Sequence, residues 1–324
     1  MNLKKSAIAL AVAGSVVAPM AVQADSGFYG SVRVGLEYFD GGLDVSTATD
    51  QTTIRGYGSR FGFKGETDMG NGLTGYGKYE VAIDTDTSGF NISGRHALVG
   101  VKGDFGNIFL GRTYHTYYNF ISGPIDIPWW GTAYTWLGYT GRTSQGLSYA
   151  GGSDNFGYGI TLTMDDSSTD AAGAANDIDR IELAANWQAG PVLLAIGYSD
   201  QDESVGVDPG EIIGFTASGW ETGIFTWGLN FSVQDDVLGK NTVDAIGIVL
   251  SAQIGNGYLH YESVELDPAG GGSSITPNTI TLGYTQALGR ATNIWYEFQA
   301  TDYDINDSST DLTVGRAVLN YSWK

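Results

Sequence analysis

Apolar and polar residues alternate along most of this chain with a period of two. In the first such stretch, apolar residues share one parity: Phe28, Val32, Val34, Leu36 and Tyr38. Polar or small residues share the other parity: Ser31, Arg33, Gly35 and Glu37. Successive side chains of a β-strand point to opposite faces, so the pattern predicts a strand with one apolar and one polar face. Similar stretches at 52–66 and 75–84 predict a second and a third strand.

Short turns rich in Gly and Asn alternate with longer acidic loops between these stretches. The short turns are predicted near 69–72, 104–107, 151–155, 189–191, 219–222, 255–257 and 288–290. The longer loops are predicted near 40–51, 85–91, 166–177, 202–209, 234–241, 267–276 and 304–311. Between these marks lie about sixteen strands of roughly 10 residues, the length that a tilted membrane strand needs. The sequence therefore predicts an all-β fold, a 16-stranded antiparallel transmembrane β-barrel.

A water-soluble β-sandwich would also alternate, and this alternative has to be weighed. The regular exchange of short turns and long loops favours the barrel, as do aromatic residues near the strand ends. A closed barrel also removes the unpaired strand edges that lipid cannot satisfy. The predicted fourth strand fits less well, because Arg95 shares a parity with Ala97 and Val99. We expect this strand to lie at a subunit contact.

One segment, residues 113–140, neither alternates nor turns tightly. It is long for a connection, and it contains three tryptophans and two prolines without helical spacing. The segment is too apolar to remain a solvated linker, so other parts of the chain must enclose it. We predict that it folds into the barrel and narrows the opening.

The N-terminus predicts a secretory signal peptide. Lys4 and Lys5 precede an apolar run over 7–22, and small residues follow at 22–24. Cleavage after Ala24 would leave a mature barrel domain of residues 25–324. Without Lys4 and Lys5, the mature chain has 14 Lys and Arg residues against 36 Asp and Glu residues. Nucleic acid is therefore not an expected partner.

Composition also limits the chemistry. The chain has no cysteine, which excludes disulfides, cysteine nucleophiles and thiolate metal sites. No Gly-rich phosphate loop ending in Gly-Lys-Ser/Thr occurs, and we predict no cofactor. Acidic runs at 165–166, 200–203 and 302–307 could bind divalent cations, although solvated faces are the simpler interpretation.

A barrel enzyme would need a nucleophile with a positioned histidine. The chain has three histidines: His96, His115 and His260. His115 begins the long segment without an evident triad, and His260 shares a parity with Glu262 in a predicted strand. We therefore predict that the protein is not an enzyme.

Several motifs resemble the general (non-specific) porins of Gram-negative outer membranes. They are the hairpin SRFGFKGETD (59–68) with GNGLTGYG (70–77), the opening GFYG (27–30), and VGVKGDFGN (99–107). The resemblance spans the mature chain. It implies a homotrimer of 16-stranded barrels in the outer membrane, surrounded by lipid and lipopolysaccharide, whose third loop forms a constriction in each lumen. It also implies passive diffusion of small hydrophilic solutes and ions.

The resemblance further implies a row of basic residues on the barrel wall, facing acids on the constriction loop. By position, Arg60, Arg95 and Arg142 match the wall residues, and Arg33 is a looser candidate. Arg112 ends the fifth predicted strand and could instead brace a subunit contact.

The constriction loop itself departs from the family pattern. It has a single carboxylate, Asp126, which is the expected acidic partner of the wall. Where relatives have a Pro-Glu-Phe-Gly-like turn, this chain has Pro128, Trp129, Trp130 and Gly131. The tryptophans could line the passage, but pinning of the loop to the wall is the favoured interpretation. The end of the chain also departs, because Lys324 follows the terminal aromatic Trp323.

The sequence thus predicts an outer-membrane channel of mixed selectivity. Wall arginines would favour anions, whereas the acidic loops would enrich cations at the mouth, most strongly at low salt. The alternative is a sugar-selective channel in which Trp129 and Trp130 stack against sugar rings.

Overall fold

The structure is a computed structural model, and it describes ten segments of the chain. They are residues 25–41, 50–85, 91–129, 142–164, 178–201, 210–221, 225–235, 244–267, 274–303 and 311–324. The predicted signal peptide, 1–24, lies outside the described residues. The described residues are nearly all strand, and no helix among them has the length and hydropathy of a membrane span.

The strands form one antiparallel sheet of 17 hydrogen-bonded elements. They are β1 (Asp25–Gly41), β2 (Gln51–Gly56), β3 (Ser59–Gly70), β4 (Leu73–Ile83), β5 (Ile92–Gly103), β6 (Gly106–Tyr114), β7 (Arg142–Gly152), β8 (Phe156–Thr163), β9 (Arg180–Ala189), β10 (Val192–Gln201), β11 (Ile212–Glu221), β12 (Phe225–Gln234), β13 (Asp244–Ile254), β14 (Gly257–Asp267), β15 (Asn278–Ala287), β16 (Thr292–Asp302) and β17 (Leu312–Trp323).

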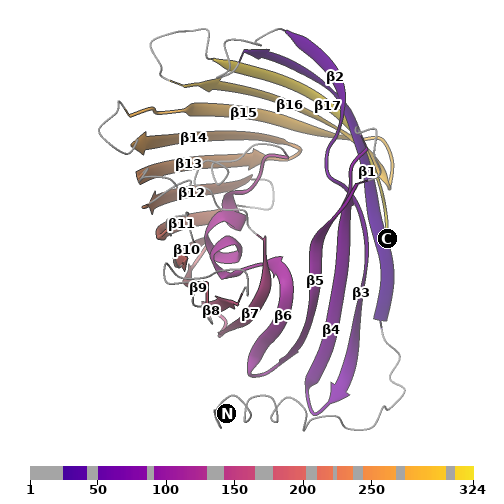
Figure 1. Cartoon of the computed structure of the whole chain (residues 1–324), viewed down its shortest axis with the longest axis vertical. Helices are drawn as coiled ribbons and strands as arrows, with labels where there is room; N and C mark the ends of the chain where they lie inside the picture. Colours follow the sequence, from indigo (N-terminus) through magenta and orange to yellow (C-terminus); the bar gives the residue numbers. More distant parts are fainter. Residues whose placement is uncertain are drawn as a thin grey trace, which may run out of the picture.

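The sheet closes on itself. β1 pairs antiparallel with β17 from Gly30 to Gly41, and consecutive strands pair around the rest of the ring (Figure 1). β2 and β3 pair one after the other with β1, so together they make one strand of the wall. The fold is therefore a closed antiparallel barrel of 16 strands, which confirms the prediction. Closure gives each described strand of the wall a hydrogen-bonded neighbour on both sides, so the sheet has no free edge strand among the described residues.

The second strand of the wall is interrupted, whereas the sequence predicted an unbroken strand over 52–66. The pairing with β1 passes from Val34–Gly56 to Ser31–Arg60, so the second strand contains one extra residue. Gly58 takes a left-handed backbone conformation there, with a φ of 67°. Such an extra residue is a β-bulge, and it reverses the face to which every later side chain points.

The two faces of the barrel differ as the alternation predicted. Phe28, Val32 and Leu36 of β1 are exposed on the outside, and Ser31 and Glu37 are buried on the inside. Around the ring, exposed large apolar side chains alternate with buried polar ones in the same way. An apolar exterior and a polar interior are typical of a barrel that has lipid outside and water inside.

Several tight turns have the conformation that their residues favour. Asn71 and Gly72 connect β3 to β4 with φ angles of 53° and 76°. Positive φ at both central residues suits the twist of a hairpin, and Asn-Gly adopts it readily. Each predicted turn that falls on described residues connects two strands; the turn near 219–222 continues beyond them.

Residues 115–129 follow β6 and lie against the polar face of the wall. They include two short helical turns, η1 (Tyr118–Ser122) and η2 (Gly123–Ile125). η1 contacts β9, β10 and β11, and η2 contacts β11, β12 and β13 (Figure 1). Residues 130–141, including Trp130 and Trp136, lie outside the described residues.

Inward-facing glycines provide the surface on which this segment packs. Tyr117 and Ile121 are buried, and they contact Gly197 of β10 and Gly214 of β11. Ile125 packs in the same way on Gly228 of β12. At these three positions the wall has no side chain between its backbone and the segment.

Candidate functional site: the arginine cluster and the segment facing it

Glu80 of β4 is the centre of a charged group on the inner wall. Its side chain is only 4% exposed, and Arg60 Nη1 lies 3.8 Å from its Oε1 atom. Tyr29 of β1 donates a hydrogen bond of 2.8 Å to the other carboxylate oxygen. Lys78 Nζ is 3.8 Å from that oxygen. Glu80 is thus shared by residues of three neighbouring strands.

Arg95 reaches the same carboxylate because β5 is irregular. The pairing of β4 with β5 shifts between Glu80–His96 and Val81–Gly94, which leaves Arg95 as an extra residue. Its Nε donates a hydrogen bond of 2.6 Å to Glu80 Oε1. The parity that Arg95 shares with Ala97 is therefore overridden by a β-bulge, and a subunit contact is not needed to explain it.

His96, the next residue, also points inward and is buried. Its Nδ1 lies 2.9 Å from Thr113 Oγ1, and its Nε2 lies 3.9 Å from Glu80 Oε1. Two consecutive residues thus face the interior, which strict alternation does not allow. Sequence reasoning missed Glu80 as the shared partner, although its place beside Lys78 on a polar strand face was the available signal.

Arg33 lies next to the tryptophans rather than in the Glu80 group. Its Nε donates a hydrogen bond of 3.3 Å to Asn320 Oδ1 of β17. Its guanidinium carbon is 5.4 Å from the ring centre of Trp129 and 5.0 Å from that of Trp295. A cation at this distance from an aromatic face is attracted by the ring quadrupole.

Arg142 connects to Asp126 through two tyrosines. Its guanidinium lies 4.7 Å from the ring centre of Tyr114 and donates a hydrogen bond of 3.1 Å to the hydroxyl of that tyrosine. Tyr114 stacks on Tyr118 with ring centres 4.1 Å apart. Tyr118 in turn donates a hydrogen bond of 2.6 Å to Asp126 Oδ2. The expected acidic residue is therefore near the wall, with tyrosines between it and Arg142.

Burial has a clear effect on Asp126. It raises the pKa of the carboxyl group above the ordinary value, although the hydrogen bond from Tyr118 acts in the opposite direction. Glu80 of the wall, rather than Asp126, makes the direct ion pairs with Arg60 and Arg95. The role of Asp126 as the partner of the basic wall stays a prediction.

Trp129 is attached to the wall. Its ring stacks on Trp295 of β16 with centres 3.6 Å apart, and its backbone N–H donates a hydrogen bond of 3.1 Å to Glu297 Oε2. Trp295 is buried, but Trp129 is 42% exposed. These contacts support the pinning interpretation for Trp129.

A second charged group beside Trp129 was not foreseen from the sequence. Arg316 of β17 donates hydrogen bonds of 2.9 Å to Glu37 Oε2 and 2.7 Å to Glu297 Oε1. Arg55 of β2 lies 3.1 Å from Glu37 Oε1. The group balances its own charges, which distinguishes it from the arginines around Glu80.

A chain of three inward side chains resembles a catalytic triad in its connectivity. Ser251 Oγ lies 2.6 Å from His260 Nδ1, and His260 Nε2 lies 3.3 Å from Glu262 Oε2. The serine hydroxyl donates a 3.1 Å hydrogen bond to the carbonyl of Ile125, and all three residues are buried. These three side chains therefore anchor η2 to the wall, and their burial leaves the serine without access to a substrate.

Metal ligands do not converge anywhere in the described part of the chain. The described residues contain no group of three or more His, Asp or Glu side chains that could hold a metal ion. The acidic runs 165–166, 200–203 and 302–307 lie largely outside those residues.

Comparison with known proteins identifies the family of this chain. The model of the Gram-negative porin family matches residues 6–306. This chain belongs to that family. Sequence relatives include the major outer membrane protein P.IB of Neisseria meningitidis, which is 35% identical over 114 residues. That match covers 34% of this chain and 34% of the relative. The P.IB protein of Neisseria gonorrhoeae is also 35% identical, over 115 residues.

Solved porin structures share the fold over a much longer part of the chain. The anion-selective porin from Comamonas acidovorans has a TM-score of 0.73 and 17% identity, covering 93% of this chain and all of its own. OmpF of Salmonella typhi, in complex with daunomycin, has a TM-score of 0.72 and 19% identity, covering 92% of this chain and 97% of its own. At these identities the likeness shows the barrel fold alone.

Proposed function

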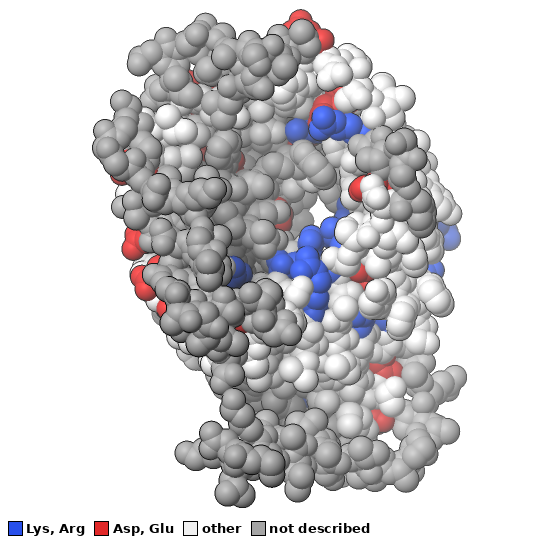
Figure 2. Space-filling model, in the orientation of Figure 1, with Lys and Arg blue, Asp and Glu red and all other residues white. Residues whose placement is uncertain are grey.

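We propose that this porin forms a water-filled channel through which small hydrophilic solutes and ions diffuse passively across the outer membrane of a Gram-negative bacterium. One observation carries the proposal. The polar inner face of a closed barrel carries Arg60 and Arg95 around Glu80, and residues 115–129 lie against the same face. In Figure 2, Lys and Arg side chains gather on one wall beside the central opening.

The organisation of the chain follows from this role. Residues 1–24 act as the signal peptide for export, and residues 25–324 form the barrel domain. Residues 113–140 fold into the lumen and narrow it, with the contacts of Tyr117, Ile121 and Ile125 holding the first half of this loop. The basic wall consists of Arg60, Arg95, Arg142 and Arg33, and the loop contributes Asp126, Trp129 and Trp130.

Selectivity arises from two opposing fields. Arginines near the narrowest point attract anions, and the excess of acidic residues enriches cations at the mouth. Bulk salt screens the exposed loop charges more effectively than the charges in the narrow passage. We expect mixed selectivity that prefers cations at low salt.

The assembled form is a homotrimer in contact with lipid and lipopolysaccharide. A porin with the same fold, OmpT of Vibrio cholerae, has been solved in a trimer form. The exposed apolar exterior of the barrel supports burial against lipid or against a neighbouring subunit. A sugar-selective channel is not favoured, because Trp129 stacks on Trp295 of the wall.

Conductance in a planar bilayer tests the proposal. The folded protein should give ohmic openings that occur in groups of three, and sugar-loaded liposomes containing it should swell until the sugar exceeds a size limit. A folded barrel that shifts on heating in gel electrophoresis but neither conducts nor admits sugars would overturn the proposal.

A further inference from the structure

A cavity on the inner wall carries an unbalanced positive charge. It has a volume of about 650 Å³ and lies where β1 begins and β17 ends. Its lining includes five cationic residues, which are Arg33, Arg60, Lys64, Lys78 and Lys324. Glu80 is the acidic residue in that lining. A volume of this size suits a small-molecule ligand.

Glu80 cannot neutralise this set of cations. Its carboxylate already accepts the 2.6 Å hydrogen bond from Arg95, which is not part of the cavity lining. Within the part of the chain that the structure describes, no carboxylate lies within ion-pair distance of Arg33, Lys64 or Lys324. The charge is notable in a chain whose formal net charge is −20.

The lysines also stand in an arrangement that costs stability. Lys64 of β3 and Lys78 of β4 are direct cross-strand partners, and both side chains point inward. Like charges directly opposite each other in an antiparallel pair repel at short range. An anion placed between them would relieve this repulsion, whereas no described carboxylate approaches Lys64.

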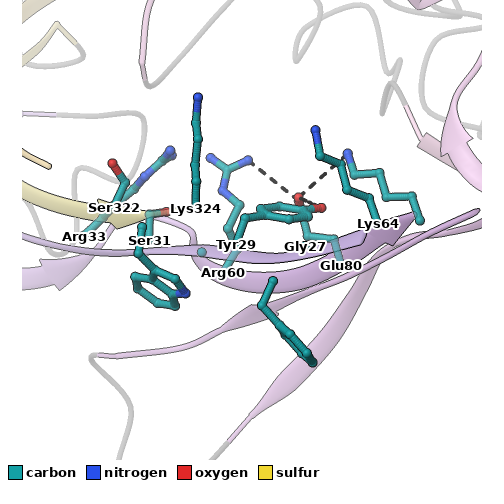
Figure 3. A pocket seen from close by; sticks show the side chains of 13 residues that line it. Gly27, Tyr29, Ser31, Arg33, Arg60, Lys64, Glu80, Ser322 and Lys324 are labelled. Atoms are coloured by element: carbon teal, nitrogen blue, oxygen red, sulfur yellow. Dashed lines mark hydrogen bonds and ion pairs between the residues drawn. The ribbon is translucent and has the colours of Figure 1, made fainter. Parts of the chain in front are cut away.

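The cations form two groups along the wall. Arg60 and Lys64 lie four residues apart on the same face of β3, which separates their Cα atoms by roughly 13 Å at the usual rise of a strand. Figure 3 shows the side chains of Arg33, Arg60 and Lys324 extending to the same side of the wall, with Lys64 further along it. Guanidinium groups match oxyanions with paired N–H donors, and lysines add point charges.

We propose that this cavity is a binding site for a linear polyanion, with Arg33 and Arg60 binding one end and Lys64 and Lys78 the other. The site rests on the proposed channel function, because it faces the lumen. The proposal defines the class of solute that the channel binds in transit. This solute is an extended molecule with acidic oxygens at both ends, such as a short oligophosphate. A compact single anion contacts fewer of these cations at once, because the backbone positions of Arg60 and Lys64 are roughly 13 Å apart along β3.

Current interruption by tripolyphosphate is the test, with orthophosphate compared at matched ionic strength. Tripolyphosphate should interrupt the single-channel current in a saturable way, at a concentration about tenfold below that for orthophosphate, because it reaches both cation groups. The double variant Lys64→Gln/Lys78→Gln should raise the half-blocking concentration of tripolyphosphate about tenfold. The charge-retaining Lys64→Arg/Lys78→Arg variant should keep the block.

Lys102→Gln is the matched control. Lys102 is another inward lysine on a neighbouring strand, but it is paired with Glu66 at 2.9 Å and is not part of the cavity lining. Equal block by the two phosphates would contradict the proposed site. So would an equal change of the half-blocking concentration of tripolyphosphate in the cavity and control variants. Calorimetric titration of the folded wild-type protein in detergent provides a second measurement, and absence of saturable tripolyphosphate binding would also overturn it. A folded wild-type protein that does not conduct even without added phosphate would instead contradict the channel function.

Discussion

At the scale of single residues, the arginine cluster of the inner wall depends on one buried acid. Glu80 contacts Arg60, Lys78 and Arg95, and its side chain is 4% exposed. Removing one partner of a buried charge group leaves the remaining charges without compensation, whereas removing one partner of an exposed pair changes little. The consequences of substitution should therefore differ strongly between Glu80 and the exposed acids.

Glu80→Gln should destabilise the folded barrel by about 3–5 kcal/mol, because the three cations around it then repel one another. Urea denaturation followed by the mobility shift in gel electrophoresis measures the loss. Glu66→Gln is the control, since Glu66 pairs with Lys102 and both side chains are about half exposed. That variant should change stability by about 0–1 kcal/mol. Equal stabilities of the two variants would contradict the central position of Glu80.

Asp126 should make ion selectivity depend on pH. Burial raises the pKa of its carboxyl group, so acidification neutralises it at a higher pH than an ordinary aspartate. The loop then loses a negative charge, and the preference of the channel should move toward anions as pH falls. Reversal potentials measured over a pH series should show this titration, and Asp126→Asn should abolish it. The same titration in the variant would assign it to another group.

At the scale of elements, alternation along the sequence was sufficient to predict the strands, the faces and most turns. It could not reveal the bulges, because an inserted residue changes pairing without changing composition. Arg95 is the clearest example: its parity indicated an outward position, yet the register shift beside Glu80 lets it reach the inner wall. The break at Tyr57 and Gly58 was hidden for the same reason.

The candidate site was predictable in part. The resemblance to porins identified Arg60 and Arg95, and the structure places both at Glu80. The partners that come from distant strands could not be deduced, because a contact such as that of Arg316 with Glu37 depends on the closing pair of β1 with β17. The hydrogen bond from Ser251 to the carbonyl of Ile125 likewise joins residues that are far apart in the sequence.

The glycine surface under η1 should control the width of the passage. A Cβ atom at Gly214 would collide with Tyr117 Oη and lie 2.6 Å from Ile121 Cγ2. Gly214→Val should therefore displace the segment and raise the size limit for sugars in liposome swelling. Gly315→Val is the control, because a Cβ atom there meets nothing within 4 Å. An unchanged size limit in a folded Gly214→Val protein would contradict a constriction by this segment.

At the scale of the whole molecule, charge is distributed unevenly. The chain has 36 acidic residues against 16 Lys and Arg residues, yet five of those cations line one cavity. The excess of acids should act at long range and weaken with salt, whereas cations inside the passage act on each ion that passes. A charge change on the inner wall should therefore affect selectivity more than the same change at an exposed turn.

The reversal potential under a KCl gradient tests this account most directly. It should be measured for the wild-type channel, for Arg60→Glu on the wall, and for Arg290→Glu at the exposed turn between β15 and β16. Both variants change the net charge by the same amount. The account predicts a clear shift toward cation preference for Arg60→Glu and a small shift for Arg290→Glu. Equal shifts, or no shift for Arg60→Glu in a conducting channel, would contradict it.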